Sequence, residues 1–278
     1  MPELLDNKTR WDGEYHWRDQ GDEWSALWGN PSMQWHGTIL PRIKSHVPAN
    51  RILEIACGYG RWTQYLKDLC QNLIAIDLSA ECIQASKQRF ADCKHIEFQV
   101  NDGRSLDMVA DSSVDFIFSF DSLVHADASV MQSYLGQFKR ILSADGVAFI
   151  HHSNFGEYAP AYSKIRDVPD LEEILIQSDI LEKSTHWRDA SVDAQKIAKF
   201  ATEAGLQCIS QEIVPWSTKN LFIDCMSTIV KNDSSLTRDN RVLRNANFMA
   251  EANNLLQLAQ LYDSVDTPHT YASNPQAD

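Results

Sequence analysis

The sequence predicts an α/β protein built on a doubly wound, mostly parallel sheet. Short apolar runs typical of strands alternate with helix-length segments from residue 37 onward. The first apolar run ends in a turn that carries two closely spaced glycines, Gly58 and Gly60. Acidic residues then follow the ends of successive strands, as in open sheets that bind a ligand beyond their carboxyl ends.

Length and composition limit the classes of function. The chain has 278 residues, 44% of them hydrophobic, which suffices for one α/β domain with additional segments. Its formal net charge of −13 argues against a nucleic-acid partner, which demands a basic face. The six cysteines form no C-x-x-C pair, so we expect buried free thiols in a reducing compartment. Neither a secretory signal nor a membrane-spanning apolar run is recognised, so we expect a cytoplasmic protein without a membrane partner.

The N-terminal segment 1–36 holds five of the eight tryptophans, interspersed with charges. We expect it to form a helical lid on the sheet rather than a tail. Its tryptophans either pack the segment against the domain or line the mouth of a ligand pocket, and both roles can hold at once. Trp28 and Trp35 are candidates for contact with a substrate.

The remaining elements follow from apolar runs, caps and turns. A helix start is indicated by Ser79 with Glu81 in its first turn, and a helix end by Gly205. The expected strands are 51–56, 71–77, 96–100, 114–120, 147–152, 207–214 and 221–231. The expected helices are 38–47, 61–70, 79–90, 128–142, 192–204 and 238–262. We expect a ligand-binding domain over 37–231, a cap insertion within it at 153–190, and a C-terminal part, 232–278, that ends in a mobile tail.

The glycine turn indicates which ligand the fold binds. Two glycines let the backbone approach a ligand closely, and the helix start behind them offers unpaired N–H groups. Thr63 stands where a dinucleotide fingerprint requires a third glycine, and no P-loop lysine follows. Glu54, inside the preceding strand, would repel a pyrophosphate but can help to hold the cationic side of a sulfonium amino acid. An NAD-dependent oxidoreductase is therefore disfavoured.

The run Glu54-Ile-Ala-Cys-Gly-Tyr-Gly60 resembles the first motif of the class I S-adenosylmethionine-dependent methyltransferases, with Ala56 at a position that is often glycine. The resemblance extends over roughly residues 37–152 and more weakly to 231. It implies a Rossmann-like, seven-stranded sheet whose last hairpin inserts antiparallel. It also implies S-adenosylmethionine as the cofactor and S-adenosylhomocysteine as the product.

Three spaced acids, Glu54, Asp77 and Asp102, lie at or near the ends of strands, so we expect them to converge on one crevice. Asp77 is placed to accept hydrogen bonds from both ribose hydroxyls. Asp102 stands where the resembling family holds the adenine amino group, although an Asx turn is the structural alternative. Asp121 is a candidate for the methionine part. The resemblance implies a cofactor site of Glu54, Ala56, Gly58, Gly60, Asp77, Leu78, Asp102, Gly103, Phe120 and Asp121.

His125 is the main catalytic candidate, because a neutral imidazole is suited to deprotonating a hydroxyl. Asp127 is a candidate for orienting its ring, and a purely structural histidine is the alternative. His151 and His152 end the fifth strand on opposite faces, so at most one of them faces the pocket. Tyr158, in the cap insertion, is a further candidate for substrate contact. The spacing does not demand a metal ion, and we expect none.

The supply of histidines favours O-methylation of a small molecule or of a sugar or glycan. The alternatives are an N-methyltransferase of a small amine, an NAD-dependent oxidoreductase and a non-catalytic protein that binds S-adenosylmethionine. The acceptor, the methylated atom and the oligomeric state, including a homodimer, stay open.

Overall fold

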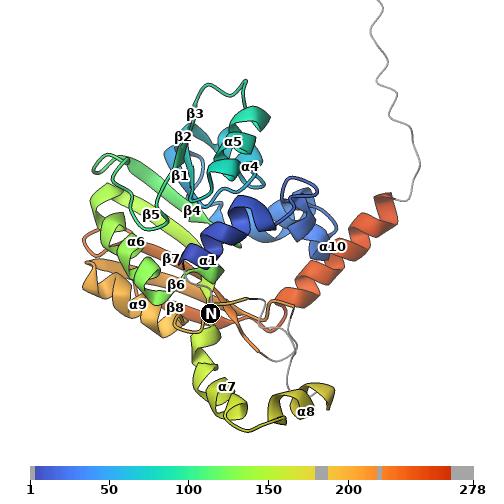
Figure 1. The fold of residues 1–278 in the computed structure, drawn as a ribbon. Coiled ribbons are helices and arrows are strands. Elements are labelled where there is room, and N and C mark those ends of the chain that lie inside the picture. Colours follow the sequence, from blue (N-terminus) through green and yellow to red (C-terminus); the bar gives the residue numbers. More distant parts are fainter. Residues whose placement is uncertain (1–3, 179–186, 218–220, 264–278) are drawn as a thin grey trace, which may run out of the picture.

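The computed structural model describes residues 4–178, 187–217 and 221–263. Within these residues one eight-stranded sheet has the order β3-β2-β1-β4-β5-β7-β6-β8 (Figure 1). The strands are β1 Ala49–Ile55, β2 Cys70–Asp77, β3 Ile96–Val100, β4 Val114–Ser119, β5 Leu142–Ser153, β6 Leu206–Val214, β7 Asp224–Lys231 and β8 Arg241–Arg244. The expected α/β class is confirmed.

The first five strands pair in parallel, and the strand order reverses between β1 and β4. This reversal is the switch point at which open α/β sheets bind their ligands. Strand β7 lies antiparallel between β5 and β6, which confirms the inserted final hairpin. The expected number of seven strands is wrong, because β8 pairs in parallel with β6 at the edge. All four residues of β8 are exposed, so no apolar alternation distinguishes this strand in the sequence.

The helices are α1 Leu4–Thr9, α2 Pro31–Gln34, α3 Leu40–Ile43, α4 Thr63–Leu66, α5 Ala80–Arg89, α6 Ala128–Ile141, α7 Ala159–Arg166, α8 Leu171–Gln177, α9 Ala194–Glu203 and α10 Phe248–Asp263. Short π or 3₁₀ turns lie between these helices. They are η1 Arg10–Glu14, η2 Asp22–Trp28, η3 Trp35–Ile39, η4 Lys67–Leu69, η5 Leu123–His125 and η6 Phe155–Glu157. The long helices expected at 38–47 and 61–70 are therefore broken into shorter pieces. The helix-rich piece expected at 238–262 contains β8, and its helix α10 begins only at Phe248.

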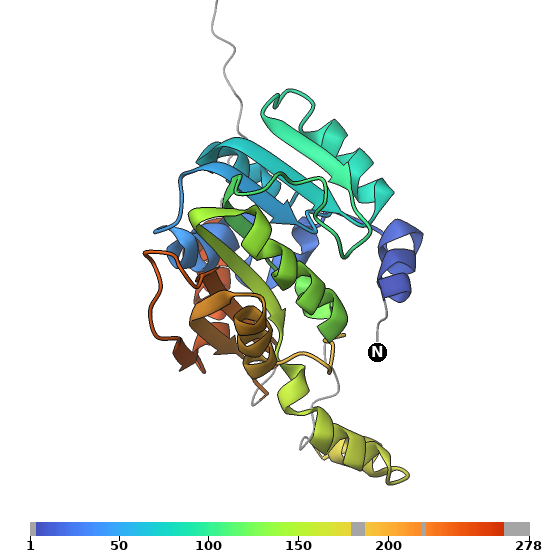
Figure 2. The same ribbon diagram turned by 90° about the vertical axis from the view of Figure 1, so that its left-hand side faces the viewer.

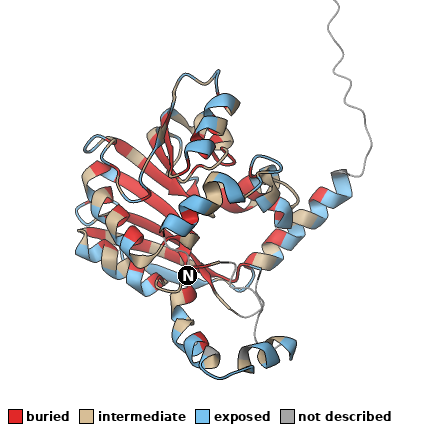
Figure 3. Ribbon diagram, viewed as in Figure 1, coloured by how far each residue is buried: buried red, intermediate tan, exposed pale blue. Residues whose placement is uncertain are grey.

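Helices cover both faces of the sheet, so both faces are apolar (Figures 1 and 2). Leu53 and Ile55 of β1 join the core formed with α6 and α9. Ile52, one residue earlier, joins the opposite core with the N-terminal helices and α10. Figure 3 shows the result as buried strands between helices whose outer faces are exposed.

Helices α7 and α8 project from the body of the molecule beside the carboxyl end of β5 (Figure 1). They belong to the cap insertion expected at 153–190, of which residues 179–186 lie outside the described residues. The expected mobile tail also lies outside them from residue 264 onward. In the part of the chain that the structure describes, no helix is both long and apolar enough to cross a membrane.

Candidate active site

A cavity of about 400 Å³ opens beyond the carboxyl ends of the strands, at the switch point between β1 and β4. Its walls come from the ends of β1, β2 and β4 and from the N-terminal segment. The expected site residues that line it are Ala56, Gly58, Asp77, Leu78, Gly103, Phe120, Asp121, His125 and Asp127. The N-terminal segment adds Leu4, Asn7, Arg10, Trp11, Trp17 and Trp24.

The glycine turn has left-handed backbone conformations, and one of its amides binds Asp77. Ala56, Gly58 and Gly60 have φ values of 60°, 55° and 87°. The Gly58 N–H donates to Asp77 Oδ2 at 2.8 Å, and the Ser79 N–H donates to Oδ1 at 2.9 Å. Burial raises the pKa of Asp77 to about 6, against the opposing effect of these amides. Each Asp77 oxygen keeps a second lone pair for a ligand hydroxyl.

Gly60 has a structural role at this turn. A Cβ at this position would lie 2.4 Å from the Phe90 ring, so only glycine lets the turn pack against the end of α5. Gly60 is not among the residues that line the cavity. Its expected contact with the cofactor stays a prediction.

Glu54 lies beneath the turn, and it is not part of the cavity wall. Its carboxylate accepts a hydrogen bond from Thr63 Oγ at 2.5 Å, and burial raises its pKa to about 8. Thr63, at the position where a dinucleotide fingerprint has glycine, thus binds Glu54. The expected effect of Glu54 on a sulfonium stays a prediction. Because Glu54 is not part of the cavity wall, this effect would be indirect.

Asp102 is exposed, and the structure brings its neighbour Asn101 to the cavity instead. The Asp102 carboxylate accepts the N–H groups of Arg104 at 2.8 Å and Ser105 at 2.6 Å, and these bonds lower its pKa. This is the Asx turn that the sequence left as the alternative. The Asn101 amide lines the cavity and donates to Tyr134 Oη at 3.0 Å. A polar residue directly after β3 was the only signal for Asn101.

His125 lies in turn η5 at the inner wall of the cavity. Its Nδ1 is 2.8 Å from the Trp187 carbonyl oxygen, which can only accept, so Nδ1 carries the proton and Nε2 holds a lone pair. The Trp11 and Trp187 rings pack beside it, with centroids 5.9 and 5.1 Å away. Burial and the Arg188 charge lower the pKa of His125 to about 4, so the ring is neutral at neutral pH.

The expectation that Asp127 orients His125 is wrong. Asp127 Oδ1 accepts the N–H groups of Ser129 at 2.7 Å and Val130 at 2.9 Å, so it caps the N-terminus of α6. The Trp187 carbonyl orients the imidazole in its place. A residue 62 positions away in sequence gave no signal for this contact.

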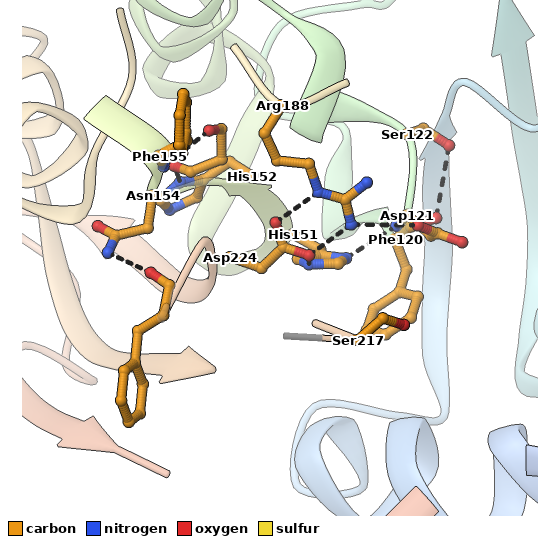
Figure 4. A network of polar contacts seen from close by, with 12 residues as sticks. Phe120, Asp121, Ser122, His151, His152, Asn154, Phe155, Arg188, Ser217 and Asp224 are labelled. Carbon is orange, nitrogen blue, oxygen red and sulfur yellow. Dashed lines mark hydrogen bonds and ion pairs between the residues drawn. The ribbon is translucent and has the colours of Figure 1, made fainter. Parts of the chain in front are cut away.

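Neither histidine at the end of β5 lines the cavity. His151 Nδ1 accepts the Asp121 N–H at 3.1 Å, and its Nε2 lies 3.1 Å from Asp224 Oδ2 (Figure 4). His152 lies on the other face, where its Nε2 is 2.8 Å from Ser227 Oγ, and burial lowers its pKa to about 4. His151 thus supports the cavity floor, and the expected substrate contact of either ring is indirect at most.

Two buried arginines that the sequence analysis did not identify complete this network. Arg61 Nη2 lies 2.8 Å from Asp121 Oδ2. Arg188 binds both oxygens of Asp224, at 2.8 and 2.6 Å, and its Nη2 is 4.0 Å from Asp121 Oδ1 (Figure 4). The position of Arg61 directly after the glycine turn could have indicated its role from the sequence. No sequence pattern indicated the role of Arg188. Among the described residues, no group of three or more His, Cys, Asp or Glu is arranged to hold a metal ion.

The expected substrate contacts of Trp28, Trp35 and Tyr158 are wrong for this cavity. Trp28 is fully buried and donates from Nε1 to Thr38 Oγ at 2.9 Å. Trp35 stacks on Tyr65 with centroids 4.9 Å apart. The Tyr158 hydroxyl accepts the Phe222 N–H at 3.0 Å, away from the cavity walls. Large apolar rings lower the free energy most where they are fully buried, so Trp28 and Trp35 pack in the core.

Comparison with known proteins is consistent with this geometry. The family described as "Methyltransferase domain" matches residues 52–146. The malonyl-[acyl-carrier protein] O-methyltransferase of Pectobacterium atrosepticum is 27% identical over 165 residues, 57% of this chain and 63% of that protein. Phosphoethanolamine N-methyltransferase 1 of Triticum aestivum is 28% identical over 130 residues, 45% of this chain and 26% of that protein. The chain thus spans less than two thirds of either relative.

A solved structure shares the fold. The S-adenosylmethionine-dependent methyltransferase from Clostridium acetobutylicum superposes with a TM-score of 0.52 at 15% identity. The superposition covers 71% of this chain and 91% of that chain.

Proposed function

Because the chain carries a methyltransferase domain of the class I superfamily, whose cofactor is S-adenosylmethionine, we propose that it methylates a hydroxyl of a small molecule or sugar. The observation that carries the choice of a hydroxyl is His125. Its neutral imidazole lines the cavity, with Nδ1 bonded to Trp187 and the Nε2 lone pair unused by that bond.

The cavity residues fit the cofactor. Asp77 faces the cavity with spare lone pairs for a ribose, and Gly58 has no Cβ beside it. Asn101 and Gly103 line the place where the chain leaves β3, on the adenine side of this arrangement. Phe120 and Asp121 line the end of β4, on the methionine side. When bound, S-adenosylmethionine supplies a methyl group already activated by its sulfonium.

His125 would take the acceptor's hydroxyl proton at Nε2 while Trp187 holds its opposite nitrogen. The acceptor oxygen, relieved of its proton, would receive the methyl group that the bound cofactor supplies. A proton shared with a positioned base is worth about 10²–10⁴ in rate. The rest of the acceleration would come from alignment of the acceptor with the methyl group inside the cavity.

We also propose that residues 4–24 act as the lid of this cavity. Trp11, Trp17 and Trp24 contribute to its walls. Asn7 donates to the His125 carbonyl at 3.0 Å, and Trp17 stacks on Tyr59 of the glycine turn with centroids 4.6 Å apart. These contacts tie the segment to both sides of the site. The aromatic walls suit the flat face of an acceptor ring or sugar.

Replacement of His125 tests the hydroxyl acceptor. His125→Asn keeps a donor for the Trp187 carbonyl but removes the base, so kcat on hydroxylated acceptors should fall at least about a hundredfold. The measurement is transfer of labelled methyl groups to panels of alcohols, sugars and amines. His95→Ala is the control, because His95 also bonds a backbone carbonyl, at 2.9 Å, but lies outside the cavity.

An N-methyltransferase of a small amine is the second candidate, because one relative carries that activity in its name. A neutral amine needs no base. If His125→Asn keeps the wild-type rate and only amines are methylated, the hydroxyl proposal is overturned in favour of this one.

A further inference from the structure

Arg10, the first residue of turn η1, is one of three arginines in the cavity wall. The other two are paired with carboxylates. Arg61 Nη2 lies 2.8 Å from Asp121 Oδ2, and Arg188 Nη2 lies 2.6 Å from Asp224 Oδ2 (Figure 4). Arg10 Nε, in contrast, is buried without a hydrogen-bond partner among the described residues. A buried donor without an acceptor costs free energy, which a ligand oxygen would recover.

Two tryptophan rings place the Arg10 guanidinium near His125. Arg10 Cζ lies 4.2 Å from the centre of the Trp187 ring and 5.8 Å from that of Trp11. The same two rings pack against the His125 ring, with centroids 5.1 and 5.9 Å away. With 4.2 Å to one side of the Trp187 ring centre and 5.1 Å to the other, the guanidinium lies within about 10 Å of the imidazole. Both groups line the cavity.

The three carboxylates of the cavity wall are engaged elsewhere. Asp121 is paired with an arginine, and Asp77 and Asp127 accept backbone N–H groups. A guanidinium stays charged at any pH at which the protein is folded, and its fork of donors binds carboxylates and phosphates. Arg10 thus attracts anions to the part of the cavity that holds His125.

A ligand that uses both side chains needs an anionic oxygen for Arg10 and a hydroxyl for His125. We propose that the acceptor is a hydroxylated acid, whose carboxylate or phosphate group binds Arg10 while its hydroxyl faces His125 Nε2. The inference rests on the proposed methylation of a hydroxyl and names the class of acceptor. Arg10 touches no reacting atom in this arrangement, so it determines specificity and orientation.

The geometry also limits the shape of the acid. Because the guanidinium and the imidazole lie within about 10 Å of each other, they suit a compact acceptor whose two groups are a few bonds apart. The indole rings of Trp11 and Trp187 lie beside both groups and suit the flat face of a phenolic acid.

The experiment compares acids with neutral partners of the same shape. The probes are the three hydroxybenzoates and lactate, each against its primary amide, and glycerol phosphate against glycerol. Transfer of labelled methyl groups gives kcat and KM, and calorimetry on the complex with S-adenosylhomocysteine gives the affinity for each probe. The wild type should favour the acid of at least one pair about tenfold or more in kcat/KM. The favoured pair tells whether the anion is a carboxylate or a phosphate.

Replacement of Arg10 tests its role in this preference. Arg10→Met should raise KM for the favoured acid about 10- to 100-fold, the value of a charge-assisted hydrogen bond. It should change kcat little, because an anchor that holds substrate and transition state alike affects KM. Binding of the neutral partner and of S-adenosylhomocysteine should stay within about twofold. Arg10→Lys keeps the charge without the fork and should restore part of the preference.

Arg244→Met is the matched control. Arg244 also lies over an aromatic ring, with Cζ 4.8 Å from the centre of Phe222, but it is outside the cavity. This variant should keep the wild-type preference for the acid. Thermal unfolding of each variant shows that it is folded.

Several results would overturn the inference while the proposed function stands. They are equal methylation of acids and neutral partners at a hydroxyl, an undiminished preference in Arg10→Met, and no binding of any acid to the complex. A loss of S-adenosylhomocysteine affinity in Arg10→Met, with the preference intact, would assign the guanidinium to the cofactor instead. A product that mild alkali cleaves is a methyl ester, and it would show that the anionic group itself reacts. If only amines are methylated, the proposed function fails and this inference with it.

Discussion

At the scale of single residues, burial changes the chemistry of ordinary side chains. Glu54 is an acid whose pKa is raised to about 8 by burial, although Thr63 bonds its charged form. His125 is a base whose pKa is lowered to about 4 by burial and by Arg188. Both side chains are therefore mostly uncharged at neutral pH, which lowers the desolvation cost of burying them.

The pKa of Glu54 predicts how stability changes with pH. Because the folded value, about 8, lies above the ordinary 4.5, stability that is present below pH 4.5 is lost as the pH rises toward 8. Glu54→Gln keeps an acceptor for Thr63 and cannot ionise. It should therefore remove on the order of 3 kcal/mol of that loss. Urea unfolding at pH 5 and pH 9 measures the difference.

The control for this prediction is Glu97→Gln on β3, where the carboxylate is exposed. It should change the pH dependence of unfolding little. An unaltered pH dependence in Glu54→Gln would show that Glu54 is already ionised in the folded protein.

At the scale of elements, caps and ion pairs place the site residues. Asp127 begins α6, and Asp193 begins α9 by accepting the Lys196 N–H at 2.8 Å. The bidentate pair between Arg188 and Asp224 anchors the chain after α8 to β7. This anchor holds the Trp187 carbonyl against His125 Nδ1. A segment far away in sequence thus determines which ring nitrogen of His125 carries the proton.

The role of Asp127 as a cap can be separated from a role in the reaction. Asp127→Ala should lower the free energy of unfolding by about 1–2 kcal/mol, whereas Asp127→Asn should retain most of it, because asparagine is also a good N-cap. Both should bind S-adenosylhomocysteine within about twofold of the wild type. Chemical denaturation and calorimetry are the measurements.

Asp193→Ala is the matched control, because it removes the same kind of cap from a helix outside the cavity. If Asp127→Asn is as stable as the wild type but methyl transfer is abolished, the carboxylate acts on the reaction after all.

At the scale of the whole molecule, the N-terminal segment closes the carboxyl edge of the sheet. Its first turns contribute to the cavity wall, whereas Trp28 and Trp35 pack into the core with Phe248 of α10. One continuous segment thus has a part that lines the cavity and a part that packs in the core. The two roles that the sequence left open for the tryptophans are divided along the chain.

This division predicts where a bound nucleoside slows hydrogen exchange. S-adenosylhomocysteine should protect backbone amides in residues 4–24, because it fills the cavity that they enclose. The amides of α10, which packs on the far side of this segment, should exchange at unchanged rates and serve as the internal control. Protection of the glycine turn alone would contradict the proposed lid.

Much of the fold could be predicted because its signals are local. The strand over 96–100 and the helix after Ser79 were found almost to the residue, since apolar runs and N-caps act over a few positions. Strand β8 and the broken helices near 38–47 were missed, because exposed edges and π turns carry no periodic pattern. Of the expected residues at strand ends, Asp77 and Asp121 line the cavity and Asp102 does not, and the partners from distant segments were not predicted.

The sequence by itself determined the α/β class, the glycine turn and the acids that follow the strands. Each of these depends on backbone conformation or on strand order, which nearby residues encode. Only the tertiary structure decided that Asn101 replaces Asp102 on the cavity wall, that Trp187 orients His125, and that Arg61 pairs with Asp121. Two of these contacts join residues that are 60 and 62 positions apart, and the third depends on which of two neighbouring residues lines the cavity. Packing of whole elements, rather than any local pattern, determines them.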